Sequence, residues 1–479
     1  MTASGTARRL VVVGAGPAGY PAAFYAADLG MDVTLVDTRA DPGGVCLYCG
    51  CIPSKALLHA AGLIAETRAA GAMGLSFAAP TVDLDALRGW KHRVVRKLTG
   101  GLGQLRKGRK VRMLQGRARF ASPSRLVVRT AEGKEETPAF DVALLATGSR
   151  PVQVPGFPVD APRVMDSTGA LALPDVPERM LVVGGGYIGL ELGTVYAALG
   201  ARVSVVEMLP GLLPGADRDL VAPVARRAEA AFESILLETR VAGVRAGESD
   251  VEVKLAGKDG GERTEVYERV LVAVGRRPNT EDLGLEAAGV AVDGRGFVQV
   301  DGARRTTEPR VFAAGDVAGE PMLAHKATHE ARLAVEAIAG RRAAFEPRAI
   351  PAVVFTDPEI AWCGLTEAEA KSSGRPVRVA RFPWSASGRA LTLDRTEGLT
   401  KLLADADSGR VLGVGISGPH AGDLIAEGAL AIEMGATVED LALTIHPHPT
   451  LSETLMEAAE AYLGHCTHLA PATRPTGRK

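Results

Sequence analysis

The chain has 479 residues, enough for about three or four domains with buried cores. Hydrophobic residues make up 46% and charged residues 23%, as in soluble globular proteins, and the formal net charge is −1. A nearly neutral chain argues against a general binder of nucleic acid or of anionic membranes. The five cysteines are too few for a framework of structural disulfides, so we expect a cytoplasmic location.

The first predicted elements lie in an uncharged stretch, residues 10–27, which follows Arg8 and Arg9 as in a signal peptide. Glycines and prolines interrupt this stretch after only four apolar residues. A secretory signal needs a longer unbroken apolar run, and a membrane helix needs a longer one still. We therefore expect neither.

Residues 9–37 and 179–207 form an internal repeat. In both copies an apolar strand leads to a glycine turn, a helix and a second strand that ends in an acid. The turn glycines are Gly14, Gly16 and Gly19 in the first copy and Gly184, Gly186 and Gly189 in the second, and the acids are Asp37 and Glu207. This pattern is typical of dinucleotide-binding units, in which the turn receives a pyrophosphate and the acid accepts ribose hydroxyls.

Two such units indicate two dinucleotides, or one dinucleotide and one vestigial unit. Met-Leu-Pro rather than arginine follows Glu207. A 2′-phosphate would be repelled by the carboxylate and would find no nearby cation, so the second unit favours NAD over NADP.

The segments around these units also have strand patterns. "ALLATGSRP" (143–151) and "VLVAVGRRPNT" (270–280) are apolar strands that end in glycine turns, and "RVFAAGDV" (310–317) is a strand that brings Asp316 to a turn. Beyond Pro351 we expect short strands at "AVVF", "VRVARF", "TKLLAD" and "VLGVGI", with helices near 421–435 and 451–463. This part is typical of an α+β domain. The Pro-rich, basic residues 470–479 are expected to be a solvated tail.

Three of the five cysteines lie in "GGVCLYCGCIPSK" (43–55). No second Cys or His pair lies at zinc spacing, and His59 would be a fourth ligand only by chance, so a metal site is disfavoured. In an ideal helix the Cα atoms of Cys46 and Cys51 would be about 8.7 Å apart, beyond the roughly 7 Å limit for a disulfide. A Cys46–Cys51 bridge therefore needs a loosened first turn, which Gly50 and Pro53 make plausible. Cys46 and Cys49 would be closer in a regular helix, so a bridge between them is a competing state.

"GGVCLYCGCIPSKALL" resembles the redox-disulfide segment of the pyridine nucleotide–disulfide oxidoreductases. "HPHPTLSE" (446–453) resembles the C-terminal signature of the branch of that family that oxidises dihydrolipoamide. The motifs "GAGPAGY", "ATGSRP", "GGGYIGLE", "GRRPN", "GDV", "MLAHKA" and "FTDPEIAWCGLTE" extend the likeness over nearly the whole chain.

The resemblance implies an α/β fold with two Rossmann-type dinucleotide-binding domains and a C-terminal α+β dimer-interface domain. The expected domains are an FAD-binding domain with the redox disulfide (1–150), an NAD-binding domain (151–280), a central domain that completes the FAD site (281–350) and the interface domain (351–479). It also implies a homodimer in which each active site is completed by the partner subunit. The expected partners are the lipoyl domains of 2-oxo-acid dehydrogenase complexes, whose dihydrolipoamide is oxidised as NAD+ is reduced.

The resemblance assigns four catalytic residues. Cys46 matches the interchange thiol that forms a mixed disulfide with the substrate, and Cys51 matches the thiolate next to the flavin. His448 matches the base, a role that suits a side chain with a pKa near neutrality, and Glu453 matches the carboxylate that orients it.

The resemblance also assigns the cofactor contacts. FAD contacts are implied for Gly14, Gly16, Gly19, Asp37, Lys55, Ala118, Thr147, Gly148, Asp316 and Ala324. NAD contacts are implied for Gly184, Gly186, Gly189, Glu191, Glu207, Val241, Ala273, Gly275 and Arg276. Within these sets, Lys55 matches a lysine near the flavin and Glu191 its ion-pair partner. Tyr187 could cover the nicotinamide side of the flavin or could pack behind the glycine turn.

Three residues depart from the family pattern: Asp37 replaces a longer glutamate, Pro21 falls inside the first helix, and Cys49 replaces an apolar residue. We expect Cys49 to behave as a small apolar residue that faces away from the flavin.

Glutathione-type reductases remain an alternative, although Glu207 disfavours the NADPH that they use. Mercuric-type reductases would need a cysteine pair near the C-terminus, where only Cys466 occurs. A chiefly structural subunit of a multienzyme complex would not need the complete catalytic set.

Overall fold

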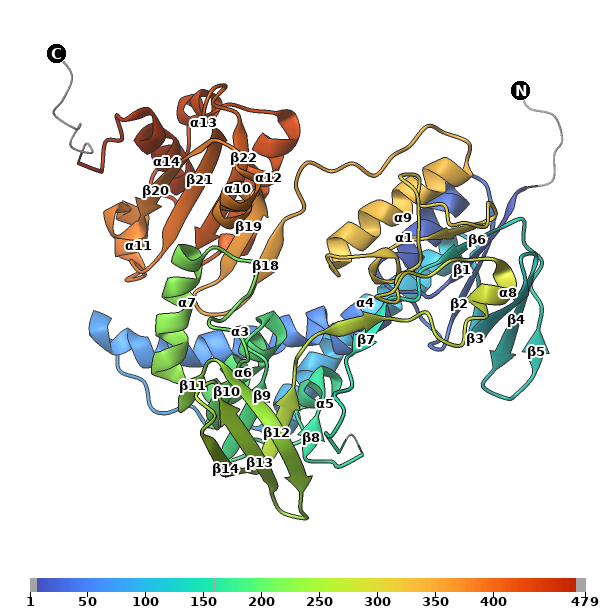
Figure 1. The fold of residues 1–479 in the computed structure, drawn as a ribbon, viewed down its shortest axis with the longest axis horizontal. Helices are drawn as coiled ribbons and strands as arrows, with labels where there is room; N and C mark the ends of the chain where they lie inside the picture. Colours follow the sequence, from blue (N-terminus) through green and yellow to red (C-terminus); the bar gives the residue numbers. More distant parts are fainter. Residues whose placement is uncertain (1–6, 159, 471–479) are drawn as a thin grey trace.

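The computed structural model describes residues 7–158 and 160–470. Its first sheet has the order β17-β6-β1-β2-β3-β4-β5 (Figure 1). The first five of these strands pair in parallel, and the last two add an antiparallel extension. The strands are β1 (Arg9–Val13), β2 (Asp32–Asp37), β3 (Arg112–Ser122), β4 (Arg125–Thr130), β5 (Glu135–Glu136), β6 (Val142–Leu145) and β17 (Val311–Ala313).

One face of this sheet packs against helices, and the other face packs mainly against side chains of the β3–β4 extension. Helix α1 (Gly19–Asp28) packs against α9 (Ala324–Ile338), while α2 (Gly44–Cys49), α3 (Cys51–Ala69) and α4 (Leu84–Gly108) form the layer that leads to the second sheet. Pro21 is the third residue of α1, between Tyr20 and Ala22, whose N–H groups donate to the carbonyls of Gly16 and Ala18. The proline therefore leaves the Pro17 carbonyl without its helical donor, and Thr328 Oγ1 donates to that carbonyl at 2.9 Å instead. The segment predicted as a central domain contributes β17 and α9 to this first unit, together with α8 (Leu285–Ala288).

The second unit repeats the doubly wound pattern. Its parallel sheet has the order β11-β10-β9-β15-β8, and an antiparallel three-stranded sheet, β12-β13-β14, adjoins it. The elements are β8 (Val164–Met165), α5 (Ser167–Ala172), β9 (Arg179–Val183), α6 (Tyr187–Leu199), β10 (Arg202–Val206), α7 (Arg218–Ala231), β11 (Ser234–Leu236), β12 (Thr239–Ala246), β13 (Val251–Gly257), β14 (Glu262–Tyr267) and β15 (Arg269–Val272). A two-stranded sheet of β7 (Ser149–Pro151) and β16 (Arg276–Pro278) joins the two units.

The C-terminal part is an antiparallel sheet of order β18-β19-β22-β21-β20 with helices packed on it. The elements are β18 (Ala352–Val354), β19 (Ile360–Gly364), α10 (Glu367–Ser373), β20 (Val377–Pro383), α11 (Gly388–Thr392), β21 (Leu399–Asp405), β22 (Val411–Ser417), α12 (Ala421–Met434), α13 (Val438–Leu443) and α14 (Glu453–Leu463). The predicted fold class is therefore confirmed. The predicted tail lies outside the described residues from 471 onward.

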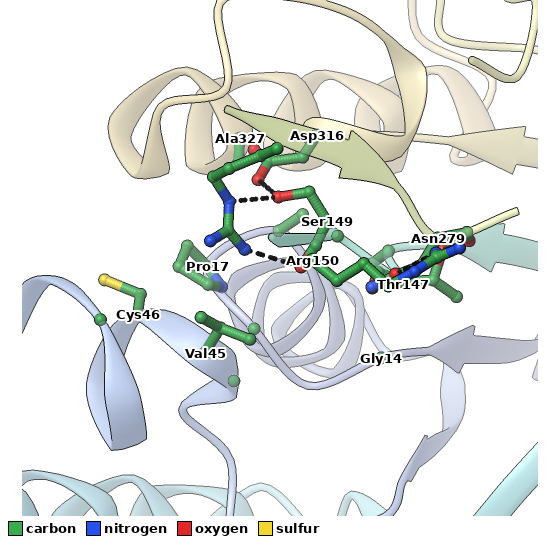
Figure 2. A pocket seen from close by; sticks show the side chains of 18 of the residues that line it. Gly14, Pro17, Val45, Cys46, Thr147, Ser149, Arg150, Asn279, Asp316 and Ala327 are labelled. Carbon is green, nitrogen blue, oxygen red and sulfur yellow. Dashed lines mark hydrogen bonds between the residues drawn. The ribbon is translucent and has the colours of Figure 1, made fainter. Parts of the chain in front are cut away.

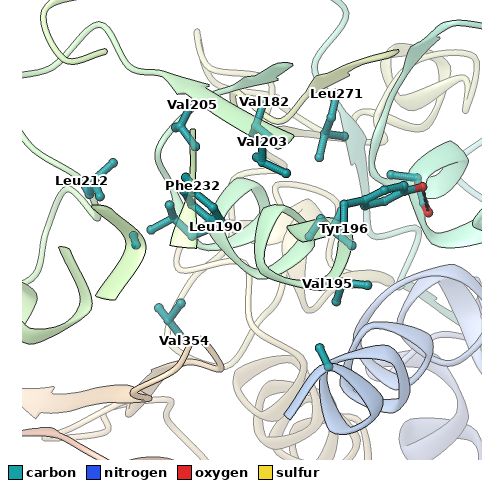
Figure 3. Packing of buried hydrophobic residues seen from close by; sticks show 14 of the residues in the cluster. Val182, Leu190, Val195, Tyr196, Val203, Val205, Leu212, Phe232, Leu271 and Val354 are labelled. Atoms are coloured by element: carbon teal, nitrogen blue, oxygen red, sulfur yellow. Dashed lines mark hydrogen bonds between the residues drawn. The ribbon is translucent and has the colours of Figure 1, made fainter. Parts of the chain in front are cut away.

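One hydrophobic cluster joins all three parts of the molecule (Figure 3). It is centred on helix α6 and the second parallel sheet, where Tyr196 is fully buried. Leu57 of α3 and Val354 of β18 belong to the same cluster. Helix α3, which begins at Cys51, is thus packed into the core of the second unit, which fixes it relative to both glycine turns.

Among the described residues, one helical stretch, Gly44–Met73, is long and apolar enough to cross a membrane by length and composition alone. A third of its most apolar window is buried inside the molecule. This is weak support for a membrane segment, because core helices of soluble proteins meet the same criterion.

Candidate active site

A cavity of about 1060 Å³ lies at the carboxyl ends of the first parallel sheet (Figure 2). Its lining includes nine of the ten residues predicted to contact FAD, namely Gly14, Gly16, Asp37, Lys55, Ala118, Thr147, Gly148, Asp316 and Ala324. Gly19 is the exception. Cys46 and Cys51 line the same cavity. Its volume suits a ligand as large as a dinucleotide, and it opens onto the thiols.

The two glycine turns have the same backbone construction. Gly14 and Gly184 have φ values of +100° and +110°, which side-chain-bearing residues rarely adopt. A Cβ on Gly19 would lie 1.7 Å from the Gly14 carbonyl oxygen, and one on Gly189 would lie 2.1 Å from that of Gly184. The third glycine of each turn therefore serves helix–strand packing, which explains why Gly19 does not line the cavity.

Each acid is hydrogen-bonded to its own glycine turn. The Ala15 N–H donates to Asp37 Oδ2, and the Gly185 N–H donates to Glu207 Oε2, both at 2.7 Å. The shorter Asp37 side chain therefore reaches the turn as closely as Glu207 does. In both units one carboxylate oxygen is held by the turn, so the acid is already placed beside the expected ribose site.

Arg276 links the two units at the cavity. Its guanidinium donates to Ser149 Oγ at 2.8 Å and to the Ser149 carbonyl at 2.7 Å. Ser149 in turn donates to the Asp316 carboxylate, as Figure 2 shows. Arg276 was predicted as an NAD contact, and it also lines the cavity that holds the predicted FAD residues. The sequence pattern did not reveal Ser149, which nonetheless orients Asp316.

Thr147 and Asn279 form a second link between the two segments. Thr147 Oγ1 donates to the Asn279 carbonyl at 2.8 Å, and Asn279 Nδ2 donates to the Thr147 carbonyl at 2.9 Å. Asn279 belongs to the "GRRPN" motif but was not assigned a role. Its mutual bonds with Thr147 fix the chain next to Gly148, which lines the cavity.

Gly50 separates the helices that carry the cysteines. Helix α2 ends at Cys49 and α3 begins at Cys51, with Gly50 between them at φ −141° and ψ −116°. The loosened turn that a Cys46–Cys51 bridge requires is therefore confirmed. All five cysteines are free thiols in this structure, so it shows the reduced form of this pair.

The pKa values of the two thiols at this break are shifted in opposite directions. A hydrogen bond from Cys46, aided by the charge of Lys55, lowers the pKa of Cys51 to about 7. The same hydrogen bond and burial raise the pKa of Cys46. Near neutral pH the reduced pair therefore holds a Cys46 thiol beside a Cys51 thiolate, which is the arrangement that its predicted roles require.

Lys55 lies one helical turn beyond Cys51 and pairs with Glu191 of α6. The Nζ–Oε2 distance is 2.7 Å, and the Glu191 side chain is 5% exposed. The other carboxylate oxygen of Glu191 accepts the backbone N–H of Phe355 at 3.0 Å, and the ring of Phe355 lies 4.4 Å from Lys55 Nζ. The predicted ion pair is present, and it is anchored from the C-terminal domain by a residue that the sequence did not indicate.

Cys49 and Tyr187 also line the cavity. Cys49, the last residue of α2, lies at the cavity wall near Thr168 and Arg39, and its orientation away from the flavin stays a prediction. Burial raises the pKa of its thiol. The Tyr187 side chain is accessible from the cavity rather than packed behind the glycine turn, which favours the first of its two interpretations.

The predicted NAD residues lie together at the carboxyl edge of the second parallel sheet. The glycine turn follows β9, Glu207 follows β10, and Ala273 follows β15. The carbonyl group of Ala273 lies against Gly184. Val241 is on β12, and the first residue of that strand, Thr239, donates its N–H to the Glu207 carbonyl at 3.0 Å. Of the predicted NAD set, Glu191 and Arg276 also line the large cavity.

His448 and Glu453 form the predicted pair in the C-terminal domain. His448 Nδ1 and Glu453 Oε1 are 2.8 Å apart, and Glu453 Oε2 accepts the Thr450 N–H at 2.7 Å. The His448 side chain is 75% exposed, and neither residue lines the cavity of its own chain. One chain therefore brings the cysteines to the cavity but does not bring the histidine there.

Comparisons with known proteins identify the whole chain. Residues 8–331 match the pyridine nucleotide-disulphide oxidoreductase family, and residues 350–459 match its dimerisation domain, which supports a homodimer. The chain is 49% identical to dihydrolipoyl dehydrogenase of Haemophilus influenzae, with 97% of each chain covered, and 49% identical to that of Thermus scotoductus, with 96% and 98% covered.

Solved structures agree with this assignment. LpdA of Mycobacterium tuberculosis has a TM-score of 0.88 at 29% identity, with 95% of this chain and 99% of that chain covered. The Cu(II) complex of the HOCl-induced flavoprotein disulfide reductase RclA of Escherichia coli has a TM-score of 0.85 at 27% identity, with the same coverage. This chain therefore belongs to the pyridine nucleotide-disulphide oxidoreductase family.

Proposed function

We propose that this protein oxidises dihydrolipoamide to lipoamide and reduces NAD+, with Cys46 and Cys51 as the redox pair. It is an enzyme and a flavoprotein that uses FAD and NAD(H). The observation that carries the proposal is the pair of thiols, with pKa values displaced in opposite directions, on the wall of a cavity lined by the FAD residues. The near-half identity to dihydrolipoyl dehydrogenases over the whole chain favours dihydrolipoamide as the substrate.

The residues of the chain perform the thiol–disulfide exchange. His448 accepts a proton from one substrate thiol, and Glu453, bonded to Nδ1, leaves Nε2 free for this step. The substrate thiolate attacks Cys46 Sγ of the Cys46–Cys51 disulfide, and Cys51 leaves as a thiolate. His448 releases this first proton to the solvent and accepts the proton of the second substrate thiol, which then attacks the substrate sulfur of the mixed disulfide and releases lipoamide and the Cys46 thiolate. That thiolate takes up a proton, giving the thiol and thiolate described above.

FAD held in this cavity would supply the two-electron chemistry that links the Cys46–Cys51 pair to NAD+. The Cys51 thiolate lies on the cavity wall, and Lys55 provides a positive charge on the same side. Glu191 holds this ammonium in place through its buried carboxylate. Glu207 accepts hydroxyls of the NAD ribose and repels a 2′-phosphate.

His448 reaches the cysteines from the partner subunit. Its exposure and its position outside the cavity of its own chain support this arrangement. Apolar side chains near it are also exposed, with Leu443 at 80% and Ile445 at 94%. Burial of these side chains against a second copy would stabilise the dimer and bring His448 to the partner's cavity. The physiological substrate would be a lipoyl domain of a 2-oxo-acid dehydrogenase complex, in the cytoplasm.

The test is steady-state oxidation of dihydrolipoamide by the FAD-bound protein with NAD+ and NADP+ side by side. We expect turnover with a preference for NAD+, and the absence of turnover with either nucleotide would overturn the proposal. His448→Ala should lose at least about 100-fold in kcat with unchanged flavin content, because removal of a general base costs this much.

Subunit exchange tests the shared site. Cys46→Ser and His448→Ala homodimers should each be inactive, whereas mixed dimers contain one intact site and should regain part of the activity. Mixed wild-type dimers that carry two distinguishable tags serve as the exchange control. Confirmed exchange without any recovery would place both residues in one chain's site.

A further inference from the structure

Four side chains with metal-binding donor atoms gather at the end of helix α14, in the C-terminal domain. Glu457 and Glu460 are one turn apart on the helix, and Gly464, at φ +86°, ends it and turns the chain back. Cys466 Sγ then lies 2.9 Å from Glu457 Oε2, and His468 Nδ1 is within hydrogen-bonding distance of Glu457 Oε1. Ligand atoms of Glu457, Glu460 and Cys466 all lie within 4.8 Å of one another.

Within the described residues, the carboxylates of this cluster have no lysine or arginine partner. Glu457 is 5% exposed, and its only charge-compensating contact among them is His468. Glu460 Oε2 is buried and has no hydrogen-bond partner there. A buried carboxylate oxygen without a donor is costly, and a cation placed between these groups would remove that cost.

We propose that Glu457, Glu460, Cys466 and His468 bind one Zn²⁺ ion. Thiolate, imidazole and carboxylate are the three ligand types that proteins use for zinc, and four of them fill its tetrahedral shell. Calcium and magnesium prefer oxygen ligands alone, so Cys466 and His468 disfavour them.

Zinc binding replaces a proton in this cluster. The Cys466 thiol donates a hydrogen bond to Glu457 Oε2 at 2.9 Å, so it carries a proton in the metal-free cluster. The zinc ion forms a bond to Cys466 Sγ, and the thiol proton leaves to the solvent. With four protein ligands the site has no open position for a substrate, which makes it structural. It would fix residues 466–468 to the helix whose first residue, Glu453, orients His448.

The experiment measures zinc bound per chain in the full-length, FAD-bound protein. The parent carries Cys46→Ser, Cys49→Ser and Cys51→Ser, because reduced active-site thiols would themselves bind zinc. After equilibration with zinc chloride and desalting, we expect about one Zn²⁺ per chain. X-ray absorption at the zinc edge should show a single sulfur neighbour at about 2.3 Å with oxygen or nitrogen completing the shell.

Substitutions in the parent assign the ligands. Cys466→Ser should abolish the sulfur neighbour, and both it and His468→Gln should weaken zinc binding at least about tenfold, a loss seen even for residues that only support metal ligands. The matched controls are Cys363→Ala, a buried thiol elsewhere in the same domain, and His465→Gln, an exposed neighbour outside the cluster. Both controls should bind zinc as the parent does.

Three results would overturn the proposal: a parent that retains no zinc, a Cys466→Ser variant that binds zinc as tightly as the parent, or a His468→Gln variant with unchanged zinc affinity. His468 is on the surface, with its side chain 58% exposed, so His468→Gln tests the site even if Glu457→Gln or Cys466→Ser fails to fold. Unchanged zinc affinity in His468→Gln would remove that residue from the proposed ligand set and with it the four-ligand site.

Discussion

The Cys51 thiol has its pKa lowered to about 7 by the Cys46 hydrogen bond first and by the Lys55 charge second. In the reduced enzyme we therefore expect Cys51 to be a thiolate above about pH 7 and to be protonated as the pH falls below it. Because Cys46 supplies the largest favourable contribution, Cys46→Ala should raise the pKa of Cys51 more than Lys55→Gln does.

The measurement is the pH dependence of iodoacetamide alkylation at Cys51, followed by peptide mass spectrometry of the reduced enzyme. Cys363 is an internal control, since burial raises its pKa to about 12 and it should stay unmodified. An alkylation midpoint near the usual thiol value in the wild type, or one that neither substitution moves, would contradict the expectation.

Glu207 is placed by its hydrogen bond from Gly185, with its second oxygen accepting the Leu209 N–H at 2.8 Å. Glu207→Ala should lower kcat/KM for NAD+ by about tenfold or more relative to NADP+, because hydrogen bonds to a charged group contribute about 1.5–3 kcal/mol. Glu248→Ala, on the loop after β12, is the surface control. If the ratio of the two kcat/KM values stays constant, another residue decides between the nucleotides.

At the scale of elements, the break between α2 and α3 sets which cysteines can pair. A Cβ on Gly50 would lie 2.9 Å from the Val45 carbonyl oxygen and 3.3 Å from Cys46 Cα, so the two helices meet closely here. The regular helical spacing that favours Cys46–Cys49 over Cys46–Cys51 is thereby interrupted.

We therefore expect Cys49→Val to keep turnover within about twofold, because the protonated Cys49 thiol resembles a small apolar side chain. Cys46→Ser and Cys51→Ser should each abolish dihydrolipoamide oxidation. The assay is steady-state turnover at matched flavin content. An inactive Cys49→Val together with an active Cys51→Ser would mean that the pair is assigned wrongly.

The sequence predicts the elements whose patterns are local. The glycine turns, the terminal acids and the strands of the C-terminal domain follow from residues near one another in the chain, and each is present. Strand β19 was missed because it begins two residues after Pro358 in "DPEIAWCG", although it is an interior strand of its sheet. The pairing of β7 with β16 was missed because it joins segments more than a hundred residues apart.

The residues of the candidate site also divide into those that a local motif predicts and those that depend on contacts between distant segments. Cys46, Cys51 and the predicted FAD set could be named from motifs. Ser149, Asn279 and the Phe355 backbone could not, because each acts through a contact between distant segments that leaves no spacing in the sequence.

At the scale of the whole molecule, a buried ionic cluster joins the second unit to the C-terminal domain. Lys401 of β21 is 1% exposed, and its Nζ lies 2.8 Å from Asp217, 3.0 Å from Asp219 and 2.6 Å from Glu367. The Asp217 carboxylate also accepts the Glu367 N–H at 3.0 Å. Removing one charge from such a buried group leaves its partners uncompensated.

Lys401→Met should lower the free energy of unfolding by about 3 kcal/mol or more, since breaking a buried ion pair by removing one partner typically costs about 3–5 kcal/mol. The control is Arg375→Met, whose pair with Asp405 is longer, at 3.7 Å, and half exposed. Denaturant unfolding of the FAD-bound proteins provides the comparison. Equal free energies of unfolding for the two variants would show that the ionic cluster does not stabilise the contact between the second unit and the C-terminal domain.

The near identity of the two glycine turns has a consequence for how such a chain can diversify. Because the backbone at Gly14 and Gly184 and the bond from turn to acid are almost the same, the turn itself does not decide which ligand a unit takes. The difference is made by what surrounds each turn. The cysteine helices, the β17 turn and Arg276 line one cavity with the first turn, whereas the glycines of the second turn do not line that cavity. Duplication of one ancestral unit can therefore yield two ligand preferences through changes in the neighbouring segments alone, with the inherited turn left untouched.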